Sequence, residues 1–233
     1  MFKKIIFFFL SIIGLNLQAT NSDSITLIFK KAESQLKEIQ KGLSSRKESE
    51  RIDANKKFIA VWETVIKNPH VLEYPFDSIK EVSILCPKNK KFKLITWNLY
   101  KDDGTHAFFG YLLVNNEKKI KKGIFKYDKV SSYEHFMLLD YSATIKNPET
   151  YIGTPAKWFG MIYYSLIECD GYYTLLGYDP NDKLIARKFV DALYFKTDGT
   201  PVFGKDIFKF PRKNPKRLMF EYSSALSHQF IRA

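Results

Sequence analysis

The chain has 233 residues, 45% of them hydrophobic, so it is long enough for one sizeable core or two small ones. Its net charge is +12, but only six of its 37 basic residues are arginine, the residue that bidentate phosphate recognition favours. This low arginine content disfavours nucleic acid as a partner, and lysines on solvated faces explain the charge. Four histidines and two cysteines lack CxxC, HxH or HExxH spacing, and no catalytic or cofactor motif is present.

Residues 1–19 have the three-part layout of a secretory signal peptide. Lys3 and Lys4 form a positive region, an apolar run follows at 5–17, and Ala19 supplies a small residue at the expected cleavage site. A membrane anchor is the alternative, but a spanning helix needs about 20 apolar residues and this run is shorter. The sequence therefore predicts an exported protein, periplasmic or extracellular, that does not span a membrane after cleavage.

Residues 20–69 form the expected helical segment. Apolar residues recur at three- and four-residue steps over 25–43 and again over 52–66, which is typical of amphipathic helices. Between these stretches, Ser45 and Glu48 have the S-x-x-E form of a capping box, and Pro69 ends the second stretch. The pattern predicts a helical hairpin, or one long bent helix, with its apolar face in the core.

Residues 70–233 form the expected β-rich domain, because apolar residues alternate with a period of two from about residue 82. Strand-like runs are joined at Asp103-Gly104, Asp170-Gly171 and Asp198-Gly199, and such pairs favour hairpin tips with glycine at positive φ. Further strands are expected at 124–127 and 218–222. The turns are unequally spaced, which favours a meander over a repeat architecture. We therefore expect an α+β fold, a helical hairpin packed on an antiparallel β-meander of about seven or eight strands.

Aromatic residues make up 16% of the chain and gather in its β-rich part. They could form a stacking platform for a sugar or another flat ligand, although strands also prefer aromatic residues for core packing. Neighbours in a strand point to opposite faces, so one residue of each tyrosine pair should be exposed. The candidate ligand-binding aromatics are Trp97, Trp158, Tyr163, Tyr164, Tyr172 and Tyr173.

Three other sets of residues have both a functional and a structural interpretation. Cys86 and Cys169 could form a disulfide in an oxidising compartment, or remain two separate thiols. The carboxylate pairs Asp102/Asp103 and Glu168/Asp170 could serve acid–base chemistry, and the oxygen ligands of 179–182 could bind calcium, but each set falls in an expected turn, where Asp is favoured. A basic cluster is either an anion-binding patch or a solvated surface, and it consists of Lys205, Lys209, Arg212, Lys213, Lys216 and Arg217.

Several motifs resemble a family of uncharacterised exported bacterial proteins. They are Thr96-Trp97-Asn98, Asp103-Gly104-Thr105 and Phe109-Gly110-Tyr111, followed by the segments 158–164 and 173–179. The resemblance covers the chain from about residue 55 onward and implies no particular activity. In similar proteins, further strands follow the segment that corresponds to residues 220–223. The resemblance therefore implies a truncated C-terminus, with 218–222 paired on one side only and a tail from residue 227 that is not native-like.

Taken together, these features predict a non-enzymatic exported protein that binds a ligand or a partner, with a polysaccharide or another envelope protein as the candidates. The alternative is an exported hydrolase acting on polysaccharide or peptidoglycan, with a site that only the fold assembles. A cleft with two carboxylates and a perturbed pKa would favour the enzyme. An aromatic-lined groove without such a pair would favour binding.

Overall fold

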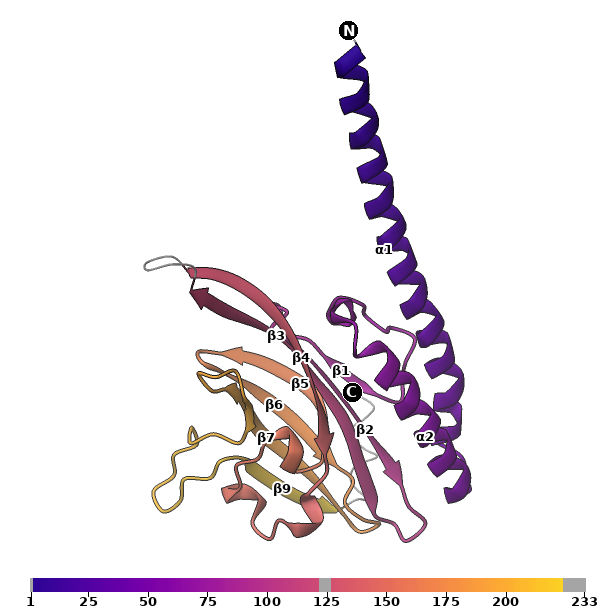
Figure 1. Ribbon diagram of the computed structural model, residues 1–233. Helices are drawn as coiled ribbons and strands as arrows, with labels where there is room; N and C mark the ends of the chain where they lie inside the picture. Colours follow the sequence, from indigo (N-terminus) through magenta and orange to yellow (C-terminus); the bar gives the residue numbers. More distant parts are fainter. Residues whose placement is uncertain (1, 122–126, 224–233) are drawn as a thin grey trace.

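Two helices, a four-stranded sheet and a five-stranded sheet stack as three layers in the computed structural model of this chain (Figure 1). The structure describes residues 2–121 and 127–223, and it describes side chains for 23–116 and 132–223. The four-stranded sheet is the middle layer, between the helices and the five-stranded sheet. The expected α+β class, with paired N-terminal helices and antiparallel strands, is confirmed.

The N-terminal helices form a pair. They are α1 (Phe2–Leu43) and α2 (Glu48–Val65), and short 3₁₀ helices follow at Pro69–Leu72, Ser142–Thr144, Pro148–Thr150 and Pro155–Lys157. The expected capping box is wrong, because Ser45 Oγ donates to Glu50 Oε2 at 2.6 Å and the residue that caps α2 is Lys47, without a side-chain bond. The helix end before Pro69 is confirmed. Among the described residues, no helix is long and apolar enough to cross a membrane.

The strands follow one another as antiparallel neighbours. The four-stranded sheet contains β1 (Ser83–Leu85), β2 (Phe92–Tyr100), β3 (His106–Lys121) and β4 (Tyr127–Leu139) in that order. The five-stranded sheet contains β5 (Ile162–Cys169), β6 (Tyr172–Asp179), β7 (Ile185–Phe195) and β8 (Pro201–Phe203), and β9 (Leu218–Ser223) pairs with β7 beside β8. The strands thus make two stacked sheets, where the sequence predicted a single meander.

The three expected hairpin tips are confirmed. Gly104, Gly171 and Gly199 have φ of +93°, +73° and +87°, and they join β2 to β3, β5 to β6 and β7 to β8. An L-residue with a Cβ rarely adopts such angles, so these positions require glycine. The strand expected at 124–127 lies almost wholly outside the described residues, and β4 begins at its last position.

The middle sheet has a core on each face because its strands alternate. On β2, Ile95 and Trp97 pack against the helices, where they meet Phe58 and other buried apolar residues. Phe92 and Leu94 face the other way, and they pack against the inner face of the five-stranded sheet. β2 is therefore buried on both faces, and seven of its nine residues are buried.

Strand β9 lies at an edge of the five-stranded sheet. Its residues are in register with β7, from Leu218 opposite Val190 to Ser223 opposite Ile185. Within the described residues β9 pairs with no other strand, which agrees with the expectation of one-sided pairing. The expectation for the tail from residue 227 lies outside the described residues.

Candidate functional site

Three of the six candidate aromatics belong to the core. Trp97 lies between the helices and the four-stranded sheet, where its Nε1 donates to Asn55 Oδ1 at 2.8 Å. Trp158 and Tyr163 are fully buried between the two sheets, and the Tyr163 hydroxyl donates to Asp191 Oδ2 at 2.7 Å. Burial raises the pKa of Tyr163 well above its ordinary value. Sequence alternation correctly separates Tyr163 from Tyr164, which is 47% exposed on the outer face of the five-stranded sheet.

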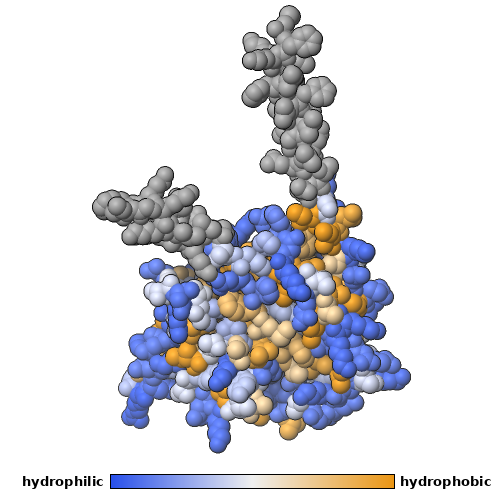
Figure 2. Space-filling view, in the orientation of Figure 1, coloured by the Kyte–Doolittle hydropathy of each residue, from blue (hydrophilic) through white to orange (hydrophobic). Residues whose placement is uncertain are grey.

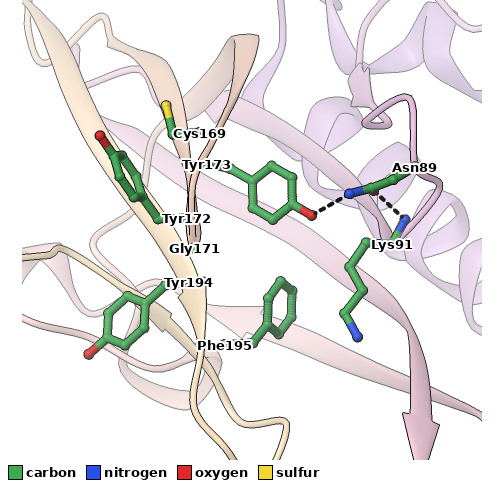
Figure 3. Close-up of a pocket in the computed structure, with 8 residues that line it drawn as sticks. All are labelled: Asn89, Lys91, Cys169, Gly171, Tyr172, Tyr173, Tyr194 and Phe195. Carbon is green, nitrogen blue, oxygen red and sulfur yellow. Dashed lines mark hydrogen bonds between the residues drawn. The ribbon is translucent and has the colours of Figure 1, made fainter.

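The other two candidates, Tyr172 and Tyr173, line a pocket of about 430 Å³ at one end of the five-stranded sheet (Figure 3). We call it the aromatic pocket, and its lining residues are Asn89, Lys91, Cys169, Gly171, Tyr172, Tyr173, Tyr194 and Phe195. The tyrosines begin β6 directly after the Asp-Gly turn, whereas Tyr194 and Phe195 end β7. The two aromatic pairs thus lie at the same end of two neighbouring strands.

The two aromatic pairs divide between the faces of the sheet. Tyr173 is in register with Leu193, and continuing this antiparallel register places Tyr172 beside Tyr194. Figure 3 shows these two rings on one side of the strands, and Tyr173 and Phe195 on the other. The second pair contacts the Phe92 ring, with centroid distances of 4.8 Å and 5.9 Å. One aromatic pair is therefore anchored in the core and the other is left at the surface.

The polar groups of the pocket come from the loop before β2. Asn89 Nδ2 donates to the Tyr173 hydroxyl at 2.9 Å, and Asn89 Oδ1 accepts from the Lys91 backbone N–H (Figure 3). Lys91 Nζ donates to Asn116 Oδ1 at 3.2 Å and lies 5.4 Å from the centroid of the Phe195 ring. An amide and an ammonium group thus lie beside Tyr173 and Phe195, and no carboxylate lines the pocket within the described part of the chain.

Sequence reasoning found half of the aromatic lining and missed the rest. Tyr194 and Phe195 precede the Asp198-Gly199 turn much as Tyr172 and Tyr173 follow an Asp-Gly turn, and this symmetry was the available signal. Asn89 and Lys91 carried no signal, because only the register of the sheets brings them near β6.

The two cysteines are free thiols in the structure. Cys86 is exposed after β1, and Cys169 is half-buried at the end of β5, where its Sγ lies 3.5 Å from Thr174 Oγ1. Cys86 as a whole is exposed, but partial desolvation of its thiol by neighbouring atoms is the main reason that its pKa is raised. The structure contains no bond between them, and the disulfide stays a prediction.

The basic cluster is largely neutralised by its own surroundings. Arg217 is fully buried, and its Nε lies 3.2 Å from Asp191 Oδ1. Lys209 and Lys216 both pair with Asp206, and Lys213 pairs with Glu149. Hydrophilic residues spread around the margin of the face in Figure 2, while hydrophobic residues gather toward its middle. These contacts favour the interpretation of the cluster as a solvated surface with one buried ion pair, rather than as an anion-binding patch.

A second concave site of about 360 Å³ lies at the other end of β6, and we call it the Asp179 cleft. Asp179 ends β6 and is only 6% exposed, with Oδ1 accepting from the Asn181 backbone N–H at 2.7 Å. Arg187 Nη1 lies 3.8 Å from Oδ2, longer than a hydrogen bond. Burial raises the pKa of Asp179 to about 6, although the hydrogen bond from Asn181 and the charge of Arg187 lower it; Asp140 and Asp182 are smaller contributions that raise it.

Asp140 does not pair with Asp179 as a second reactive carboxylate. Its Oδ1 accepts from the backbone N–H and the hydroxyl of Ser142 at 3.0 Å and 2.6 Å, and its Oδ2 accepts from Phe108 N–H at 3.1 Å. Both oxygens thus tie the start of β3 to the segment after β4. Asp140 is also absent from the residues that line the cleft within the described part of the chain.

Asp103 and Asp182 serve turns, as the sequence predicted, whereas Asp102 Oδ1 accepts from Arg51 Nη2 at 2.6 Å and Glu168 Oε1 accepts from the backbone N–H of Lys88. Asp103 Oδ1 accepts from Thr105, and Asp182 Oδ1 accepts from the backbone N–H groups of Leu184 and Ile185. Across the described residues, no three His, Cys, Asp or Glu side chains gather as a metal site would require. Comparison with protein-family models, with curated proteins and with solved structures finds no match for this chain.

Proposed function

We propose that this chain is an exported, non-enzymatic binding protein whose aromatic pocket takes a segment of polysaccharide. The observation that carries the proposal is a pocket at the end of the five-stranded sheet that is lined by two aromatic pairs, one from each face of the sheet, and by Asn89 and Lys91, with no carboxylate among its described lining residues. Sugar rings present apolar faces that stack on aromatic rings, and hydroxyl groups that bond to amide and ammonium groups. The N-terminal signal-like sequence and the resemblance to exported bacterial proteins support export.

Lysine side chains beside the pocket favour acidic sugars as its ligands. Lys205 Nζ lies 4.5 Å from the centroid of the Tyr194 ring, and Lys91 lies at the opposite side of the lining. An aromatic ring can stack on the face of a sugar while an ammonium group beside the ring donates to a carboxylate of that sugar. Uronic acid polymers therefore fit this pocket better than neutral glucans.

Hydrolysis, the alternative function, is supported less well. A glycoside hydrolase needs two carboxyl groups that both reach the substrate. The aromatic pocket has none among its described lining residues, and in the Asp179 cleft the neighbouring Asp140 has both oxygens engaged by the chain itself. The geometry therefore favours binding over hydrolysis.

Calorimetric titration with hexagalacturonate, cellohexaose and chitohexaose tests the proposal. We expect hexagalacturonate to bind most tightly, and Tyr172→Ala to weaken its binding by about two- to tenfold, the range for one aromatic contact. Tyr172→Ala with Tyr194→Ala should reduce binding below detection. Tyr164→Ala removes an exposed tyrosine from the same sheet outside the pocket and serves as the matched control. If no hexasaccharide binds, or if the double variant binds as the wild type does, the proposal is wrong.

A further inference from the structure

The five-stranded sheet has an apolar outer face. Side chains along β5, β6, β7 and β9 alternate between the core and the outside, because successive residues of a strand point to opposite faces. We call the surface on the outside the outer face, and its apolar residues include Tyr164, Ile167, Leu176, Val190, Leu218 and Phe220. Ile167 and Phe220 are 53% and 55% exposed, so no described segment of the chain covers them.

The register of the strands makes this surface continuous. Leu176 on β6 lies opposite Val190 on β7, and Val190 lies opposite Leu218 on β9. Apolar side chains thus form a row across three strands instead of being scattered singly. A contiguous apolar patch on a protein surface marks an interaction site.

The outer face carries very little charge. Among the described residues of β5, β6, β7 and β9, Lys188 is the charged side chain that alternation turns outward. Tyr178 and Phe220 lie opposite it in register on the two neighbouring strands, and its Nζ lies 5.7 Å from the centroid of the Tyr222 ring. Two copies of this chain, each with a net charge of +12, therefore meet little like-charge repulsion across this face.

The outer face is complementary to itself. In a two-fold dimer, residue i of one copy contacts residue j of the other, and j contacts i in return. Lys188 of one copy can therefore lie over the Phe220 ring of the second copy, and the reciprocal contact forms at the same time. A membrane surface is a poorer match, because binding to anionic headgroups needs a cluster of cations and this face has one.

The area of the outer face is in the range of a weak dimer. Four strands about 4.8 Å apart, with roughly seven residues each at about 3.4 Å per residue, cover about 450 Å² before the relief of the side chains is counted. A stable interface buries about 800 Å² per partner, and crystal-packing contacts mostly bury less than about 400 Å² per partner. The face is therefore large enough for specific association at micromolar concentration.

We propose that the outer face is the interface of a homodimer, in which a second copy of this chain packs its own outer face against it in a two-fold arrangement. The two sheets then stack face to face, as the two sheets within one chain already do. This inference does not rest on the proposed function, because it uses the surface of the sheet and not the aromatic pocket.

Sedimentation velocity between about 1 µM and about 300 µM protein tests the proposal. We expect the mass to rise from that of a monomer toward twice that value. Phe220→Lys and Ile167→Lys each place a further cation on the outer face, and each should raise the dissociation constant at least tenfold. Leu27→Lys makes the same kind of change at a 67% exposed residue of α1, in the layer beyond the middle sheet, and should dimerise as the wild type does.

Urea unfolding shows whether these variants still fold. Ile167 and Phe220 are more than half exposed, so a lysine at either position should leave the midpoint of unfolding at low protein concentration nearly unchanged. Loss of the dimer in a variant with an unchanged midpoint then reports on the interface alone.

Four results would overturn the proposal. The first is a wild type that stays monomeric at about 300 µM. The second is a wild type that forms assemblies larger than a dimer, because a two-fold contact closes at two copies. The third is association that survives both Phe220→Lys and Ile167→Lys. The fourth is association that Leu27→Lys removes as well.

Discussion

Replacing Asp179 with asparagine should make the protein more stable at neutral pH. The asparagine side-chain oxygen can still accept the Asn181 N–H, while the buried negative charge disappears. The side chain of Asp179 is only 9% exposed, so water screens this charge poorly. Burial of a charge destabilises a fold unless an opposite charge compensates it, and Arg187 at 3.8 Å does so incompletely.

The magnitude follows from the pKa of Asp179. In the folded chain it is raised from 3.8 to about 6, so the folded state binds more protons than the unfolded state between these values. Stability from this group is therefore fully present below pH 3.8 and is lost as the pH rises through 6. The difference of about 2 pH units between the folded and unfolded pKa values corresponds to about 3 kcal/mol at pH 7 and to less than about 1 kcal/mol at pH 4. Asp179→Asn escapes this loss.

Urea unfolding of the wild type and Asp179→Asn at pH 4 and pH 7 measures the effect. We expect the variant to gain about 2–3 kcal/mol at pH 7 and almost nothing at pH 4, with a melting temperature higher by roughly 5–10 °C at neutral pH. Asp198→Asn is the matched control, because hydrogen bonds from Thr200 lower the pKa of Asp198 and its removal should not stabilise the fold. An equal gain at both pH values, or a less stable variant at pH 7, would refute the reasoning.

Three further predictions concern the core and the N-terminus. Burial lowers the pKa of Lys93 to about 8, so the unfolded state binds more protons than the folded state above that pH. The free energy of unfolding of the wild type should therefore rise by about 2 kcal/mol relative to that of Lys93→Met between pH 8 and pH 10, and parallel pH profiles of the two proteins would contradict this. Arg217→Met leaves the buried Asp191 without its cation and should cost about 3–5 kcal/mol in urea unfolding, whereas adding Asp191→Asn should recover most of it; a loss below 1 kcal/mol for the single variant would show that the pair is unimportant. Mass spectrometry of the exported protein should find Thr20 as its first residue, and an intact Met1 in that fraction would exclude cleavage of residues 1–19.

The sequence by itself determined the local elements of this protein. The spacing of apolar residues predicted the two helices, because one face of a helix repeats every 3.6 residues whatever it packs against. The three Asp-Gly pairs predicted the hairpin tips for an equally local reason, since a tight turn needs a residue that tolerates positive φ. Alternation also predicted that Tyr163 and Tyr164 would differ in exposure.

Only the tertiary structure decided which of these elements meet. The division of the strands into two stacked sheets depends on long-range packing, in which Phe92 of β2 contacts Tyr173 of β6. This packing buries Trp97 and Trp158 on opposite sides of the middle sheet, although their sequence contexts resemble that of the surface aromatics. The same packing encloses Asp179 and raises its pKa. The pKa of a carboxylate depends on its solvation and on charges on other strands, and no local sequence pattern encodes either.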